Sequence, residues 1–373
     1  MRLLIAAASA ACAFALAPAL VVGAPATERA VVVIEGGGAP NAYSTPWDAC
    51  DRGRSPYVQA MVDAGLPVFT APGFTSTKGS ASGQTGCPPQ PPIEVQWNTG
   101  GYPTQTGQAV LGLLGYLNAT YGYRTFDLVG YSYGGLVARA TVAALKRAPA
   151  PGAMAPAFSY AQSARAAGVT VPSMVTLNTP HLGGPAYDLA TNPSGLIAPV
   201  LRTWGREIVG SGLRLSAYQR RGGAGAFDVL VTGAHARRNS ASWDSRQVGM
   251  LDGVALTLVA GDFCGRTCVM GSDASRRATN PRLRTDGTVP VYSQLMLPCP
   301  SRCPSPPGSV YIPRGMVPAG TVRKTFATIH SWSDTKALRL PTNLSVSSNP
   351  SAVDFLVRTV VGTWKAAGVP VAP

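Results

Sequence analysis

The stretch Gly130-Tyr131-Ser132-Tyr133-Gly134-Gly135 decides the fold of this chain. An apolar run, 126–129, leads into it, and an alanine-rich run with helical spacing, 136–145, leads out of it. The sequence therefore predicts a strand, a sharp turn and a helix, with a serine at the apex of the turn. The glycines fit this arrangement because the helix must pass close to the strand that precedes it.

Such a turn can present a nucleophile. A serine hydroxyl is a weak nucleophile at its own pKa, so it needs a general base, and the base needs an orienting carboxylate. The N-terminus of the following helix would face any negative charge that develops beside Ser132. The alternative is a glycine-rich turn with a solvent-facing serine, and the predicted flanking elements favour the nucleophile.

Only three histidines can supply the base. His330 ends the last predicted strand, 322–329, and a terminal helix follows it, which suits a chain with the order serine, acid, base. Its alternative role is that of a surface histidine in a polar loop. We expect His181 to be structural, with its ring hydrogen-bonded to a loop beside the site, and His235 to lie on the surface.

The carboxylate should come from the region after the fifth predicted strand, 254–260. Asp286 is favoured because an Asp-Gly turn followed by Val289-Pro290 would hold a carboxylate rigidly. The alternatives are that Asp286 forms an ordinary Asx turn, and that Asp262, which directly ends the strand, is the acid. We expect Asp262 instead to cap a loop.

An oxyanion hole needs two backbone N–H groups. One should belong to Tyr133, the residue after the nucleophile, and the other to the glycine loop after the first strand, where Gly37 is favoured over Gly36. A phosphate site in this glycine loop is disfavoured, because the loop lacks the G-x-G-x-x-G spacing and no clear helix follows it.

Strands alternate with helices along the chain. Helices are predicted over 56–64, 106–121, 136–145 and 352–365, and strands over 30–34, 66–70, 125–130, 171–177, 254–260 and 322–329. This alternation predicts an α/β fold with a mostly parallel sheet and helices on both faces. The segments 71–103 and 148–170 are predicted as long connections, and 183–250 as an irregular insertion. The candidate site residues follow strand ends, where open α/β sheets place their sites.

The first 26 residues predict a secretory signal peptide. Arg2 supplies a positive start, residues 3–20 are apolar, and Ala24 and Ala26 form a small-x-small cleavage site that would leave Thr27 first. A membrane anchor is the alternative, and Pro18 and the weakly hydrophobic alanines argue against it. The sequence thus predicts an exported protein, either extracellular or periplasmic.

Cysteine usage agrees with export. Cys12 would leave with the leader, and an even number of cysteines remains, which predicts three disulfides. The preferred pairing closes two small loops and one longer one, although six cysteines allow fifteen connectivities. The preferred pairs are Cys50 with Cys87, Cys264 with Cys268, and Cys299 with Cys303. Because no histidine lies near the short pairs, a metal site is disfavoured.

The formal net charge of +14 would attract anionic surfaces or acidic substrates. The arginines are scattered and are not interleaved with aromatic residues, so nucleic-acid binding is not predicted. A generic charged surface is the simpler interpretation.

The whole mature chain resembles a secreted α/β-hydrolase of the bacterial lipase and esterase type. The matching stretches are Gly130–Arg139, Asn178–His181, Asp286–Pro290 and Ile329–Ser331. The resemblance implies ester hydrolysis through an acyl-enzyme, with Ser132, Asp286 and His330 as the catalytic triad. It implies that the insertion at 185–250 forms a lid over an acyl pocket. No calcium-site pattern stands out, and no cofactor or metal is predicted. The chain departs from the family after the first strand, where Glu35 replaces the usual histidine before the glycine.

Three functions follow from these observations. The first is a secreted serine esterase acting on lipid-like esters, at a lipid–water interface if the substrate is a lipid. The second keeps the fold and changes the substrate, as in a polyester depolymerase or an acyltransferase. The third is a catalytically silent binding protein, against which the complete set of triad residues argues.

Overall fold

A computed structural model describes the central part of the chain, with gaps. The described residues are 28–37, 56–74, 97–98, 100–147, 157–192, 194–197, 206–218, 230, 243–244, 246–263, 284–297, 312–331, 334–335 and 339–371. The predicted signal peptide, the six cysteines of the predicted disulfides and His235 lie outside these residues. The signal peptide, the three disulfides and the surface position of His235 therefore stay predictions. Among the described residues, no helix combines the length and the apolar composition that a membrane span needs.

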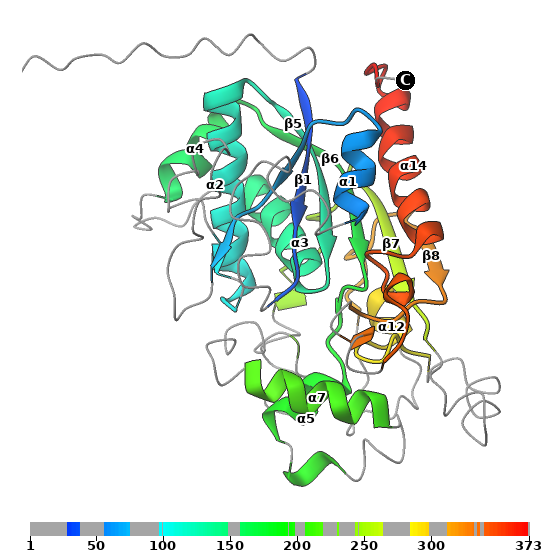
Figure 1. Cartoon of the computed structure of the whole chain (residues 1–373). Coiled ribbons are helices and arrows are strands. Elements are labelled where there is room, and N and C mark those ends of the chain that lie inside the picture. Colours follow the sequence, from blue (N-terminus) through cyan, green and yellow to red (C-terminus); the bar gives the residue numbers. More distant parts are fainter. Residues whose placement is uncertain are drawn as a thin grey trace, which may run out of the picture.

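A parallel sheet of six strands forms the centre of the described part of the molecule (Figure 1). The strands run in the order β2-β1-β5-β6-β7-β8, and every pair of neighbours is parallel. They are β1 (Arg29–Ile34), β2 (Val68–Thr70), β5 (Thr125–Tyr131), β6 (Thr170–Leu177), β7 (Ala255–Gly261) and β8 (Val322–Phe326). The predicted α/β fold with a mostly parallel sheet is confirmed.

Helices cover both faces of this sheet. One face carries α1 (Pro56–Asp63) and α14 (Pro350–Ala366), and the other carries α2 (Pro103–Tyr121), α3 (Tyr133–Lys146) and α4 (Ala157–Ala166). The alternation of side chains along β1 separates two cores. Val31 and Val33 pack with α1 and α14, whereas Val32 and Ile34 pack with α2 and α3.

Two predicted connections contain structure. The segment 71–103 includes β3 (Gly73–Phe74) and β4 (Trp97–Asn98), which pair as a small second parallel sheet. The segment 148–170 includes α4, which the alanine-rich composition concealed because small side chains such as Ala161 and Ala164 are among those it buries against the core.

The last strand is shorter than predicted. The sequence predicts 322–329, but β8 ends at Phe326, where the N–H of Thr328 turns back to the carbonyl oxygen of Phe326. Ile329 then forms an isolated bridge to Ser345. Ile329, the last residue of the predicted strand, is buried without extending the sheet.

The insertion after β6 includes the helices α5 (Pro185–Thr191) and α7 (Arg206–Tyr218). They cross at Gly212, where an added Cβ would lie 2.7 Å from Leu189 Cδ2. Figure 1 shows both helices beyond the end of the sheet to which the strand arrows point. The insertion is therefore next to the edge where the candidate site residues were predicted.

Candidate active site

Ser132 is at a strained turn between β5 and α3. Its backbone has φ 53° and ψ −125°, a region that residues with a Cβ rarely adopt. The glycines after it allow the close approach that the turn needs. A Cβ added to Gly134 would lie 2.0 Å from the carbonyl oxygen of Ile34, and one added to Gly135 would lie 2.0 Å from Thr179 Oγ1. The predicted strand, sharp turn and helix are present.

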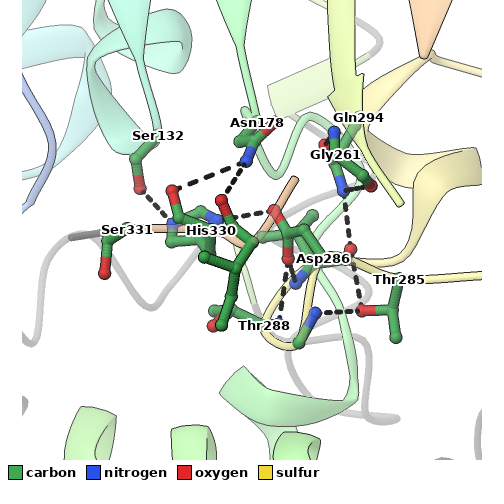
Figure 2. A network of polar contacts seen from close by, with 12 residues as sticks. Ser132, Asn178, Gly261, Thr285, Asp286, Thr288, Gln294, His330 and Ser331 are labelled. Carbon is green, nitrogen blue, oxygen red and sulfur yellow. Dashed lines mark hydrogen bonds and ion pairs between the residues drawn. The ribbon is translucent and has the colours of Figure 1, made fainter. Parts of the chain in front are cut away.

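Three of the predicted site residues form one hydrogen-bonded chain, shown in Figure 2. Ser132 Oγ lies 2.9 Å from His330 Nε2, and His330 Nδ1 lies 2.7 Å from Asp286 Oδ2. The Asp286 and His330 side chains are buried. Because a carboxylate accepts at Nδ1, that nitrogen carries the proton and Nε2 is left to accept from the serine hydroxyl. The geometry suits a serine nucleophile with its base and orienting acid.

The loop that carries Asp286 is held by its own backbone. Asp286 Oδ1 accepts hydrogen bonds from the N–H of Thr288 at 2.9 Å and of Val289 at 2.6 Å. Gly287 takes a positive φ of 92°, so the tight turn needs a glycine there. The predicted Asp-Gly turn is therefore present, and it leaves Oδ2 to face the histidine.

Gln294 ties this loop to the end of β7. Its amide donates to the carbonyl oxygens of Val289 (2.7 Å) and Gly261 (3.2 Å), and its Oε1 accepts from the N–H of Gly261 at 2.8 Å. The side chain is fully buried. Sequence reasoning missed Gln294, because nothing in its neighbourhood distinguishes it from a surface glutamine.

The loop that carries His330 is held by three other segments of the chain. The N–H of His330 donates to the carbonyl oxygen of Asp286 at 3.0 Å, and the hydroxyl of Tyr131 donates to the carbonyl oxygen of His330 at 2.7 Å. The amide of Asn178 reaches the carbonyl oxygen of Ile329 at 3.3 Å. Tyr131 and Asn178 both lie in stretches that carried the family resemblance, but the sequence did not show what they hold.

The charges around His330 favour its protonated form. Burial by itself would lower the pKa of His330, but the neighbouring Asp286 carboxylate reverses this and raises the pKa above the ordinary value. Asp334 adds to the rise, and Arg214 opposes it. Burial raises the pKa of Asp286, against the pull of His330 and the two backbone N–H groups. An imidazolium formed during catalysis would thus be stabilised by its partner.

The other candidate acid lies elsewhere. Asp262 Oδ2 forms an ion pair with Arg284 at 2.6 Å, and both side chains are partly exposed. Asp286, not Asp262, is the carboxylate that contacts His330 in the structure.

His181 is buried and has a different environment from His330. Its Nε2 lies 3.0 Å from Thr176 Oγ1, so its partner is on strand β6, whereas the sequence predicted a loop. Burial and the nearby Arg139 guanidinium hold the pKa of His181 well below its usual range. A neutral, buried ring fits the structural role that was predicted.

The two stretches predicted to supply the oxyanion hole lie close to the serine. An added Cβ on Gly36 would lie 3.1 Å from Ser132 Cβ, so the loop after β1 runs beside the serine, and Gly37 is the next residue along that loop. Tyr133 begins α3, and its hydroxyl donates to the carbonyl oxygen of Gly101 at 2.5 Å. Gly37 and Tyr133 stay the predicted donors.

Within the described ranges, no three histidine, cysteine, aspartate or glutamate side chains gather in a way that could hold a metal ion. The parallel sheet, the strained serine turn between β5 and α3, and the serine–histidine–aspartate chain define the fold as that of an α/β-hydrolase.

Comparison with known proteins agrees with this class. A family model described as "Putative serine esterase (DUF676)" matches residues 106–198, the segment that includes most of α2, the serine turn and His181. No curated protein matches the chain.

Two solved lipase structures are among those similar to this chain. The mature lipase BlEst2 of Bacillus licheniformis shows 15% identity and a TM-score of 0.45, over 91% of this chain and 94% of that one. Lipase 1 of Pelosinus fermentans shows 15% identity and a TM-score of 0.43, over 89% and 99%.

The parallel-sheet fold and the match to a family model described as a serine esterase confirm the resemblance to an esterase of the α/β-hydrolase class. The family match supports an ester hydrolase.

Proposed function

We propose that this protein is a secreted serine carboxylic-ester hydrolase that cleaves lipid-like esters through an acyl-enzyme on Ser132. The observation that supports this most directly is the contact chain from Ser132 Oγ through the His330 ring to the buried Asp286 carboxylate. The predicted signal peptide motivates the export part of the proposal, and the resemblance motivates the lipid-like substrate.

The first half-reaction forms the acyl-enzyme. His330 Nε2 takes the proton of the Ser132 hydroxyl as its oxygen attacks the ester carbonyl carbon, and the carbonyl oxygen becomes an oxyanion. Backbone N–H groups of Tyr133 and Gly37 would stabilise this oxyanion, each with about 2.7–4 kcal/mol. The tetrahedral intermediate then collapses, the ester C–O bond breaks, and His330 gives its proton to the leaving alcohol.

The second half-reaction releases the acid. A water molecule donates its proton to His330 Nε2 and attacks the acyl carbon, and collapse of the second tetrahedral intermediate returns the proton to the Ser132 oxygen. The buried Asp286 holds the proton on Nδ1 throughout, so that Nε2 alone exchanges protons with serine, alcohol and water. No other group is needed to balance these steps.

Hydrolysis of a short-chain and a long-chain nitrophenyl ester tests the proposal, with Ser132→Ala as the control. We expect turnover of both esters by the wild type and loss of about 10⁶ in kcat in the variant. Turnover restricted to the short chain would make the protein an esterase without the lipid-like preference. Turnover that is unchanged in Ser132→Ala would contradict the assignment of the nucleophile.

Covalent capture gives a second readout that does not depend on the choice of ester. An organophosphonate probe should add once to the wild type, at Ser132, and not to Ser132→Ala. Peptide mapping locates the adduct. For export, N-terminal sequencing of the secreted protein should begin at Thr27, and an N-terminus at Met1 would contradict the predicted cleavage.

A further inference from the structure

One face of the insertion helix α7 touches both loops of the candidate triad. Ser211 Oγ lies 2.5 Å from Thr288 Oγ1, in the loop of Asp286, and Arg214 forms an ion pair with Asp334, in the loop of His330. Ser211 and Arg214 are three residues apart, so they project from the same side of the helix. Asp286 and His330 are 44 residues apart in the sequence, and α7 contacts the loops that carry both of them.

Each contact lies one step from a triad residue. The N–H of Thr288 donates to Asp286 Oδ1 at 2.9 Å, so the residue held by Ser211 also holds the acid. Asp334 accepts from the hydroxyl of Ser331, the neighbour of His330, at 2.6 Å. A movement of α7 would therefore act on both loops.

The insertion is anchored at its start as well. An added Cβ on Gly184 would lie 2.9 Å from Pro290 Cδ, and the N–H of Leu182 donates to Ser293 Oγ at 3.0 Å. Both contacts tie the chain before α5 to the segment that follows Asp286. Because α7 packs on α5 at Gly212, the pair of helices is held against the loop of Asp286 both by α7 and by the chain before α5.

We propose that α7 is a positioning element of the active site, in which Ser211 and Arg214 hold the loops of Asp286 and His330 together and Asp334 is a positioning residue for His330. This rests on the proposed function, because it assigns a role to residues around the same triad. This role differs from that of a simple lid, because the active arrangement is the one in which α7 packs against the two loops.

The charges that face His330 make the proposal measurable. They are Asp286 from the acid loop, Asp334 from the loop of His330 itself, and Arg214 from α7; the Tyr131 ring on β5 is 5.9 Å away. Asp334 is buried, whereas the Arg214 side chain is 46% exposed. Removing Arg214 leaves the negative charge of Asp334 uncompensated, which favours protonated His330. Removing the charge of Asp334 has the opposite effect.

The test uses the mature protein and five variants: Arg214→Gln, Asp334→Asn, the double variant, Arg358→Gln as a control, and His330→Gln to assign a signal. Arg358 pairs with Asp354 on the exposed side of α14 and matches Arg214 as a surface arginine in an ion pair. The first readout is the NMR titration of the His330 Cε1–H signal, identified by its absence in His330→Gln. It requires no turnover. The second is the pH profile of kcat/KM with a nitrophenyl ester.

We expect Arg214→Gln to raise the pKa of His330 and Asp334→Asn to lower it, with the acidic limb of kcat/KM moving in the same directions. The double variant should show that the two effects are not additive, as expected for residues in contact. In Arg214→Gln, kcat should fall by up to about 100-fold, the cost of misplacing a catalytic group by about 1 Å. Arg358→Gln should behave as the wild type in every measurement.

The outcomes separate this proposal from the proposed function. Opposite shifts of His330 in a protein without esterase turnover would support the positioning contact and overturn the ester-hydrolase proposal. Esterase turnover with an unmoved His330 signal in Arg214→Gln would overturn the positioning role of α7. If Asp334→Asn fails to fold because Asp334 is buried, Arg214→Gln still decides the question, since its side chain is half-exposed.

Discussion

Gly36 lies directly against Ser132. A Cβ built on Gly36 would lie 3.1 Å from Ser132 Cβ and 3.5 Å from Ser132 Oγ. The loop after β1 and the serine turn therefore lie so close together that a side chain at position 36 would force its neighbours to shift by a few tenths of an ångström. This contact explains why a glycine occupies position 36, although its backbone does not have the left-handed conformation that favours glycine.

A methyl group at position 36 should disturb the serine without unfolding the protein. We expect Gly36→Ala to lower kcat by about 10- to 100-fold, because Ser132 must give way by a few tenths of an ångström. Steady-state kinetics and a thermal melt would separate the two effects. Gly362→Ala on α14 is the matched control, since an added Cβ there meets nothing within 4 Å. Equal activity of the two variants would argue against close contact between the β1 loop and the serine.

The choice between the two candidate acids can be tested directly. Asp286→Asn should lower kcat by up to about 10⁴, because an amide in its place would favour the wrong histidine tautomer. Asp262→Asn should stay near wild type, because Asp262 contacts Arg284 and not the histidine. Loss of turnover in Asp262→Asn, with Asp286→Asn near wild type, would reverse the assignment.

The pH dependence of turnover follows from His330. Only the neutral ring accepts the serine proton, so kcat/KM should fall as the pH drops through the pKa of His330. Because Asp286 raises that pKa, the acidic limb should lie above the ordinary histidine value. Asp286→Asn removes the raising charge, so in its residual activity the limb should move to lower pH. A limb that stays in place would show that another group controls it.

Removing Arg139 from its buried ion pair with Asp244 should make the free energy of unfolding depend on pH. Arg139 is fully buried, lies 4.4 Å from the Trp243 ring centroid and pairs with Asp244 at 3.2 Å. Burial raises the pKa of Asp244 to about 6, although Arg139 opposes the rise. Arg139→Met removes that opposition and leaves Asp244 unpaired, which should cost about 3–5 kcal/mol once the carboxyl is ionised.

The sign for Arg139→Met follows from linkage. A carboxyl whose folded pKa exceeds its unfolded value binds more protons in the folded state, so stability falls as the pH rises through that window. His181 changes the stability difference between variant and wild type in the same direction. Without Arg139, one cause that disfavours protonation of His181 at low pH is removed, so the variant loses less stability there. Thermal melts at pH 5 and pH 8 should show the larger deficit at pH 8. A deficit that is equal at the two pH values would contradict the unpaired carboxyl.

Much of the local structure could be predicted from the sequence. The strand, turn and helix around Ser132 follow from an apolar run, glycines at close contacts and a helical run, all of which act over a few residues. The Asp-Gly turn at Asp286 is equally local, because its backbone N–H groups bind its own carboxylate. The order of serine, acid and base at strand ends, with the Asp-Gly turn, favoured the three residues that the structure brings together.

The supports of these residues could not be predicted in this way. Gln294, Tyr131 and Asn178 contact segments distant in the sequence, so no local periodicity marks them. The helix α4 was missed because its alanines bury little surface and give a weak pattern. The early end of β8 was missed because burial of Ile329 outside the sheet resembles the apolar pattern of a strand.

The sequence by itself determined most of the sheet strands and the larger helices, their alternation and the chemistry of three residues, because these depend on local propensity, spacing and side-chain type. Only the tertiary structure decided which carboxylate meets His330, and which face of α7 touches the two loops. Those relationships depend on how parallel strands align their ends and how the insertion packs against them. The catalytic roles of Ser132, Asp286 and His330 stay predictions that the variants above test.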